Sequence, residues 1–147
     1  MKRKMVIGML TMGMVLCGAM TVSAESDGYV ISASHGYGAV EHWEIKTIGM
    51  QDAAKDLGVE FNYKYADGDL QQEVADIENF VEMGTNYIIV GPCNSEGIVP
   101  VIEEAQDKGV AVGTCDIGIE GVDVASFVSS DNYGIGELSL IHISEPT

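Results

Sequence analysis

Basic side chains are scarce in this sequence of 147 residues, in which seven lysines and arginines stand against 23 aspartates and glutamates. Three of the seven lie together at residues 2–4, in a segment that we expect to be removed. Four basic side chains then remain against 23 acidic ones, a net charge of −19. Proteins that bind nucleic acids need a positive face to neutralise phosphates, and anionic membranes attract positive charge. The composition argues against nucleic acid as a partner and disfavours adsorption to anionic lipids.

Cysteine is also scarce, with three in the chain, and Cys17 lies in the segment that we expect to be removed. Cys93 and Cys115 fall at the ends of two predicted buried strands. Two cysteines do not define a disulfide framework. We interpret them as small buried side chains, and a bridge between them stays open if their strands are neighbours.

Sequence motifs for catalysis, nucleotide binding and metal binding are missing. The loop at residues 34–41 (SHGYGAVE) has two glycines of the dinucleotide fingerprint, but Glu41 stands at the third position and would repel a pyrophosphate. The chain has no GxxxxGK phosphate loop and no GxSxG nucleophile elbow. His35, Glu41 and His42 do not form an HExxH pattern, so they are weak evidence for a metal. We predict no cofactor, no metal and no enzymatic activity.

The first 24 residues have the pattern of a secretory signal peptide. A positive segment at residues 2–4 precedes an uncharged apolar stretch at 5–20, and small residues at 22–24 precede the expected cleavage. The apolar stretch is short for a membrane span, which needs about 20 residues. The alternatives are an uncleaved membrane anchor and lipidation of Cys17, although Leu16 stands where lipoprotein signals have a small residue. We expect cleavage and an extracytoplasmic mature protein.

The last ten residues, 138–147 (LSLIHISEPT), break with the composition of everything before them. They match the translation of a transposase adaptor used in sequencing, read in one frame. We interpret this segment as a scar and exclude it from the fold prediction. The alternative is a genuine strand. On the first interpretation we expect the natural reading frame to continue beyond this chain.

Between residues 29 and 128, short apolar segments alternate with segments of helical periodicity. We predict strands at 29–34, 59–65, 87–91, 110–115 and 124–128, and helices at 41–57, 70–83 and 95–108. The strand at 87–91 is too apolar to have one face in water. This pattern predicts an α/β fold in which a parallel sheet has helices on both faces, three layers in all.

The periodicity also predicts which helix residues face the sheet. In the first helix these are Ile45, Ile48, Gly49, Ala53 and Leu57; in the second, Leu70, Val74, Ile77 and Val81; in the third, Ile98, Val101, Ile102 and Ala105. Acidic residues off these stripes are interpreted as solvated, among them Asp52, Asp56, Glu73, Asp76 and Glu82.

Open parallel sheets bind ligands beyond the carboxyl ends of their strands, where the strand order reverses. That rule selects three loops, at residues 35–42, 92–95 and 116–121. In or beside them, Trp43 offers a flat apolar face that can cover a sugar ring, and it can instead pack in the core. Asp116 can accept hydrogen bonds from two adjacent hydroxyls, and it can instead serve a turn.

Asn94 is the remaining candidate side chain in these loops, because an amide can both donate and accept hydrogen bonds. Capping of the third helix is the more common task for an asparagine at such a position. His42 precedes Trp43 and completes the set of candidate ligand-binding residues.

With these residues in place, the chain resembles the type I periplasmic sugar-binding proteins, the ribose/galactose-binding family of ABC importers, over about residues 28–137. The likeness rests on the His42-Trp43 pair opening the first helix and on an apolar strand ending in proline at 88–92 (IIVGP). It rests further on a strand followed by aspartate at 110–116 (VAVGTCD), and on SSDN at 129–132 before a crossing into a second lobe.

The resemblance implies two α/β lobes that close over a small ligand, of which this chain holds the first. The implied division is a signal peptide at 1–24, a ligand-binding lobe at 25–129, the start of the crossover at 130–137 and the scar at 138–147. Two positions depart from the family: Ile117 stands where arginine is common, and Gly91 where asparagine is common. The identity of the ligand therefore stays open.

The expected function is a solute-binding protein that closes about a hinge on a small polar ligand, most simply a monosaccharide, and delivers it to an ABC permease. His42, Trp43, Asn94 and Asp116 are the expected ligand-binding residues. We expect a monomer. The alternative function on the same fold is a ligand sensor that reports to a chemoreceptor or a sensor kinase.

Overall fold

The computed structural model describes residues 28–38 and 40–144. It contains β1 (Val30–His35), α1 (Glu41–Leu57), β2 (Glu60–Tyr65), α2 (Leu70–Glu82), β3 (Tyr87–Gly91), α3 (Val99–Asp107), β4 (Ala111–Cys115), β5 (Ser126–Val128) and α4 (Asn132–Ser144). The expected signal peptide lies outside the described residues. Among the described residues, no helix is long and apolar enough to cross a membrane.

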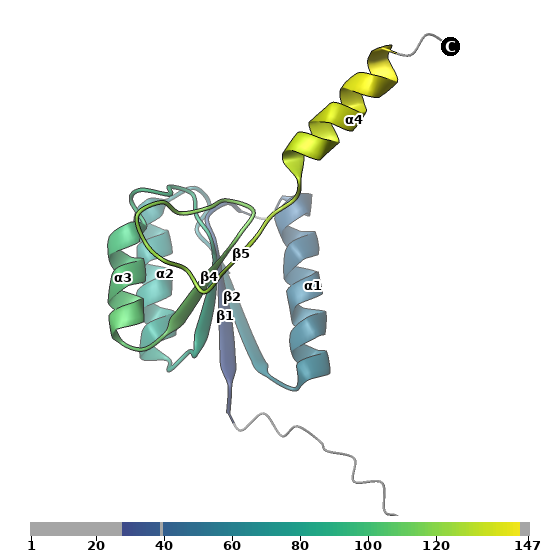
Figure 1. Ribbon diagram of the computed structural model, residues 1–147. Helices are drawn as coiled ribbons and strands as arrows, with labels where there is room; N and C mark the ends of the chain where they lie inside the picture. The colour runs from purple at the N-terminus through teal and green to yellow at the C-terminus, as the bar shows by residue number, and fades with distance from the viewer. Residues whose placement is uncertain (1–27, 39, 145–147) are drawn as a thin grey trace, which may run out of the picture.

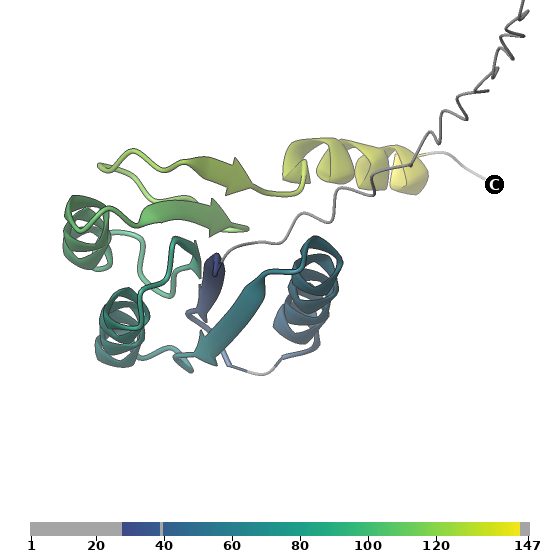
Figure 2. The ribbon, with the colours of Figure 1, turned by 90° about the horizontal axis from the view of Figure 1, so that it is seen from below.

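The five strands form one parallel sheet in the order β2-β1-β3-β4-β5. Helices α2 and α3 cover one face of the sheet and α1 lies against the other, as the two views in Figure 1 and Figure 2 show. The predicted three-layer α/β fold is confirmed. Because β1 lies between β2 and β3, the strand order reverses at β1, and the carboxyl ends of β1, β3 and β4 meet at one edge.

The core lies between the sheet and the pair α2 and α3. Its buried members are Ile77, Phe80, Ile88, Val90, Ile98, Val101, Ile102, Ala105, Val110 and Val112. The stripe predicted for the third helical segment is confirmed, although α3 itself begins only at Val99, after a turn that contains Ile98.

The stripe predicted for α1 is wrong. Ile45, Ile48 and Leu57 are 62%, 57% and 63% exposed, while α1 buries Trp43, Thr47 and Ala54 against the sheet. The helical spacing of the apolar residues selected the isoleucines. The face that meets the sheet is instead set by Trp43, whose ring is large, and by small residues that let the helix approach.

The interpretation of Glu73 and Asp76 as solvated is also wrong. Glu73 is completely buried and Asp76 is 4% exposed, both on the face of α2 that meets the sheet and the loops above it. Asp69 precedes α2 and caps it, because its carboxylate accepts from the backbone N–H groups of Gln71 and Gln72.

The C-terminal segment continues as a helix that projects away from the sheet (Figure 1). Helix α4 runs from Asn132 to Ser144 without a break at the expected boundary between residues 137 and 138. The strand considered as an alternative for the last ten residues is therefore absent as far as Ser144. The predicted fifth strand is also shorter than expected, since β5 spans only Ser126–Val128.

Candidate functional site

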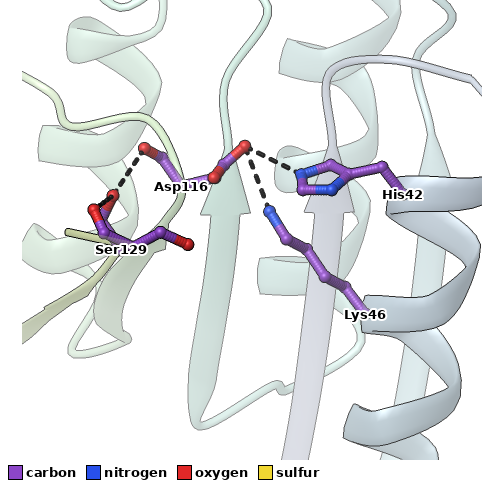
Figure 3. Close-up of polar contacts among 5 residues, drawn as sticks. His42, Lys46, Asp116 and Ser129 are labelled. Carbon is purple, nitrogen blue, oxygen red and sulfur yellow. Dashed lines mark hydrogen bonds and ion pairs between the residues drawn. The ribbon is translucent and has the colours of Figure 1, made fainter. Parts of the chain in front are cut away.

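Three polar side chains meet at the carboxyl edge of the sheet, as Figure 3 shows. His42 and Lys46 come from the first two turns of α1, and Asp116 directly follows β4. The Nε2 atom of His42 and the Nζ atom of Lys46 each lie 3.1 Å from Oδ2 of Asp116. The fold thus joins residues 74 positions apart into one cluster.

The backbone at Asp116 has a left-handed conformation, with φ of 69°. A residue other than glycine adopts this conformation at a cost, and such positions gather at functional sites. The Oγ atom of Ser129, just after β5, donates to the backbone oxygen of Asp116 at 3.3 Å. The turn after β4 is therefore held by the sheet edge on one side and by α1 on the other.

The electrostatics of the cluster favour an ionised Asp116. Partial burial by itself raises the pKa of the carboxyl, but the contacts with His42 and Lys46 and their charge outweigh it and hold the pKa below its ordinary value. Both contacts fall on Oδ2. The sequence predicted the negative charge of Asp116 at this edge of the sheet. It did not predict the cation that lies beside it.

Lys46 is that missed residue. Its Nζ atom is removed from solvent, and its contact with Asp116 is an ion pair outside the angular range of a hydrogen bond. The same atom lies 4.4 Å from the centre of the Trp43 ring, within cation–π range. The position of Lys46 one helical turn after His42 was the available signal, because residues i and i+4 share a helix face.

Trp43 lies beside the cluster but is buried, with 4% of its surface exposed. Its ring is tilted against His35 at 5.2 Å and meets the His42 ring edge-on at 5.6 Å. Its outer carbons approach Gly91 so closely that a Cβ atom there would lie 2.6 Å from two of them. The structure thus has the core packing that the sequence left open as the alternative for Trp43.

Tyr37 is an exposed aromatic side chain at this edge. It is 43% exposed, and its ring stacks on Trp43 with a centroid distance of 6.4 Å and an interplanar angle of 25°. Its hydroxyl is 3.4 Å from the backbone oxygen of Cys93. A ligand ring that approaches from solvent therefore meets Tyr37 before Trp43.

Asn94 does not join the cluster through any contact that the described residues show. It is exposed, and its Oδ1 accepts from the backbone N–H groups of Glu96 and Gly97. Those bonds close the turn that precedes α3. Asn94 thus accepts hydrogen bonds in the way expected of a helix cap, but in the turn before α3 and not at the first residue of the helix.

The loops after β1 and β3 pack directly on each other. Gly36 donates its backbone N–H to the backbone oxygen of Gly91, and a Cβ atom at Gly36 would clash with the backbone nitrogen of Cys93. The first glycine of the apparent dinucleotide fingerprint is therefore required by this contact between loops. Beneath this contact between the loops, the buried carboxyl of Glu73 accepts a hydrogen bond from the backbone N–H of Cys93 at 3.0 Å. A buried acidic residue therefore holds the loop after β3 from the interior side.

His35 ends β1 in the interior beneath these loops and is completely buried. The Thr47 hydroxyl donates to the backbone oxygen of Trp43, so it accepts from Tyr65 at 2.9 Å and from His35 Nε2 at 3.0 Å. This fixes the proton of His35 on Nε2. Burial, with the positive charge of Lys46, lowers the pKa of His35 to about 4, so the ring is neutral.

The residues considered for metal binding do not gather in one place. His35 is buried, His42 points to Asp116, and within residues 28–38 and 40–144 no group of three or more metal-binding side chains forms.

Cys93 and Cys115 are both free thiols. A hollow of about 400 Å³ opens beside the cluster, and its lining consists of Lys46, Gly49, Met50 and Ala53 of α1, Cys115, Asp116 and residues 128–130.

Comparison with known proteins gives consistent findings. A family model described as a periplasmic binding protein domain matches residues 36–143. The D-xylose-binding periplasmic protein of Haemophilus influenzae is 30% identical over 128 residues, which cover 85% of this chain and 39% of that protein. The ribose import binding protein of Bacillus subtilis is 29% identical over 97 residues, 66% of this chain and 32% of that protein.

Solved structures agree with these sequence relatives. The crystal structure of an ABC transporter solute-binding protein from Mycobacterium smegmatis, with bound glycerol, superposes with a TM-score of 0.71. The two chains are 28% identical, and the match covers 76% of this chain and 38% of that one. This chain spans less than half the length of the relatives that it matches.

Proposed function

Because the chain belongs to the periplasmic binding protein domain family, we propose that it contributes the first lobe of an extracytoplasmic solute-binding protein. That protein captures a small polar molecule, most simply a sugar, and delivers it to an ABC permease. Relatives named for D-xylose and ribose support the ligand class. The proposed role needs no catalytic group, cofactor or metal.

The observation that carries this proposal is the cluster of His42, Lys46 and Asp116. It lies at the carboxyl edge of a parallel sheet beside the strand-order reversal, where this architecture binds ligands. The His42 and Lys46 nitrogen atoms both approach Oδ2 of Asp116, which leaves Oδ1 as the acceptor for a ligand hydroxyl. Such charge-assisted hydrogen bonds are stronger than neutral ones.

The aromatic part of the proposed site consists of the stacked rings of Tyr37 and Trp43. In the conformation described here a sugar ring would contact Tyr37, and it would reach Trp43 only after Tyr37 moves. Asn94 contributes to the rim through the turn that it closes. A second lobe would supply the opposite wall, and contacts to both lobes would stabilise the closed form.

The proposed organisation keeps the boundaries expected from the sequence. A cleaved signal peptide occupies residues 1–24, the lobe spans 25–129, the crossover begins at 130–137, and the tail at 138–147 is foreign to the protein. The proposed whole protein is monomeric. The match to 39% and 32% of the two sequence relatives and to 38% of the solved structure supports a protein with a further lobe.

The test is thermal unfolding of the longer protein, expressed from the recovered reading frame, with and without D-xylose, D-ribose, D-glucose, D-allose and myo-inositol. A ligand at 100 times its Kd stabilises the folded state by about 2.7 kcal/mol. We expect at least one sugar to raise Tm and the 147-residue chain to respond weakly or not at all. Failure of every sugar to raise the Tm of the longer protein would overturn the proposal.

A further inference from the structure

Among the described residues, Lys46 is the one lysine or arginine at the proposed site, and it contacts both Asp116 and Trp43. Its Nζ atom lies 3.1 Å from Oδ2 of Asp116 and 4.4 Å from the centre of the Trp43 ring. The atom is shielded from solvent although the side chain as a whole is 25% exposed. A solvent-shielded ammonium needs a counter-charge, and Asp116 supplies it.

We propose that Lys46 is a positioning residue, which fixes the carboxylate of Asp116 and the indole of Trp43 in one geometry before a ligand arrives. The expected effect on ligand binding rests on the proposed function, whereas the contacts of Lys46 with Asp116 and Trp43 do not depend on it. Without the ammonium, the Asp116 side chain would keep only the bond from the exposed His42 ring. The face of Trp43 that Lys46 covers would also open.

Two consequences for ligand choice follow from this arrangement. The charge of Lys46 balances that of Asp116, so a neutral polyol does not have to approach a bare carboxylate. A side chain fixed in advance loses less conformational freedom on binding, which improves affinity. Lys46 therefore favours neutral hydroxylated ligands over cationic ones, which would need Asp116 as a free counter-charge.

The charged groups around Asp116 can be separated experimentally. His42 and Lys46 approach from α1, and Cys115, whose thiol stays neutral because burial raises its pKa, ends β4 directly before Asp116. Lys46→Met removes the charge and keeps the length of the chain, and Lys46→Arg keeps the charge. Lys55→Met is the matched control, because Lys55 is an exposed residue in the last turn of the same helix.

The first measurement needs no ligand and uses the 147-residue chain. NMR titration of the Asp116 carboxyl gives its pKa, and Trp43 emission is unambiguous because the chain has one tryptophan. We expect Lys46→Met to raise the Asp116 pKa and to change the emission, Lys46→Arg to restore the low pKa, and Lys55→Met to match the wild type. An unchanged pKa and emission in Lys46→Met would overturn the inference.

The second measurement uses the longer protein and the sugar found by thermal unfolding. We expect Lys46→Met to weaken binding about tenfold, with Lys46→Arg close to the wild type. Equal affinity of Lys46→Met and wild type would overturn the positioning role. If no sugar binds the wild type, the proposed function fails by itself, and the pKa and emission of the 147-residue chain still decide the role of Lys46.

Discussion

The close approach of Trp43 to Gly91 makes Gly91→Ala a sharp test of the packing beneath the proposed site. The added Cβ would lie 2.6 Å from Cζ3 and Cη2 of Trp43. Carbon atoms in contact prefer about 3.5–4.0 Å, so the ring has to retreat by about 1 Å. Lys46 and His35 contact the ring from other directions and oppose that movement. Overpacking of this kind costs about 1–3 kcal/mol.

Equilibrium urea unfolding, followed by Trp43 emission and by circular dichroism, measures that cost. We expect a lower free energy of unfolding for Gly91→Ala and a shift of its native emission. Gly49→Ala is the matched control, because Gly49 lies within α1 and an added Cβ there meets nothing within 4 Å. It should gain about 0.5–1 kcal/mol from helix propensity. If Gly91→Ala instead matches the wild type in stability and emission, the described Trp43 packing is refuted.

Three further predictions concern buried and capping groups. Since the pKa of His35 is lowered from 6.5 to about 4, the unfolded chain binds the proton more tightly, and stability should fall by about 2 kcal/mol from pH 7 to pH 5 through this group. His35→Gln should flatten the slope in urea unfolding, and a wild-type slope in the variant would contradict this. Burial raises the pKa of Glu73, so its ionisation destabilises the folded state as pH rises above the ordinary value of 4.5. Glu73→Gln should raise the urea midpoint at pH 7 but not at pH 4, and a lower midpoint at both would contradict this. Asp69→Ala removes the cap of α2 and should cost about 1 kcal/mol in the same assay, whereas an unchanged midpoint would show that the cap contributes nothing.

The alternation of strands and helices was predictable because it depends on local patterns. Helix α1 begins and ends at the predicted residues, 41 and 57, and its end follows from Gly58, which adopts a positive φ of 69°. The continuous apolar strand at 87–91 required helices on both faces of the sheet. Each of these features depends on one segment of the chain, so it can be predicted from the local sequence.

The errors within the helices have one physical cause. The stripe of Ile45, Ile48 and Leu57 satisfies helical periodicity nearly as well as the stripe that is buried. Only the sheet decides between them, because Trp43 fits over Gly91. Glu73 was assigned to solvent because it lies off the predicted apolar stripe, and its actual partner, the N–H of Cys93, lies 20 residues away in the loop after β3.

The sequence by itself determined the fold class, the edge of the sheet where polar residues gather, and the membership of His42 and Asp116 in that group. The tertiary structure alone decided that Lys46 joins them, that Trp43 is covered and that Tyr37 faces solvent. The difference follows from distance along the chain. Strand and helix patterns arise from neighbours in sequence, whereas the partners of a side chain depend on how α1 lies over β3 and β4, a geometry set by the packing of the whole domain.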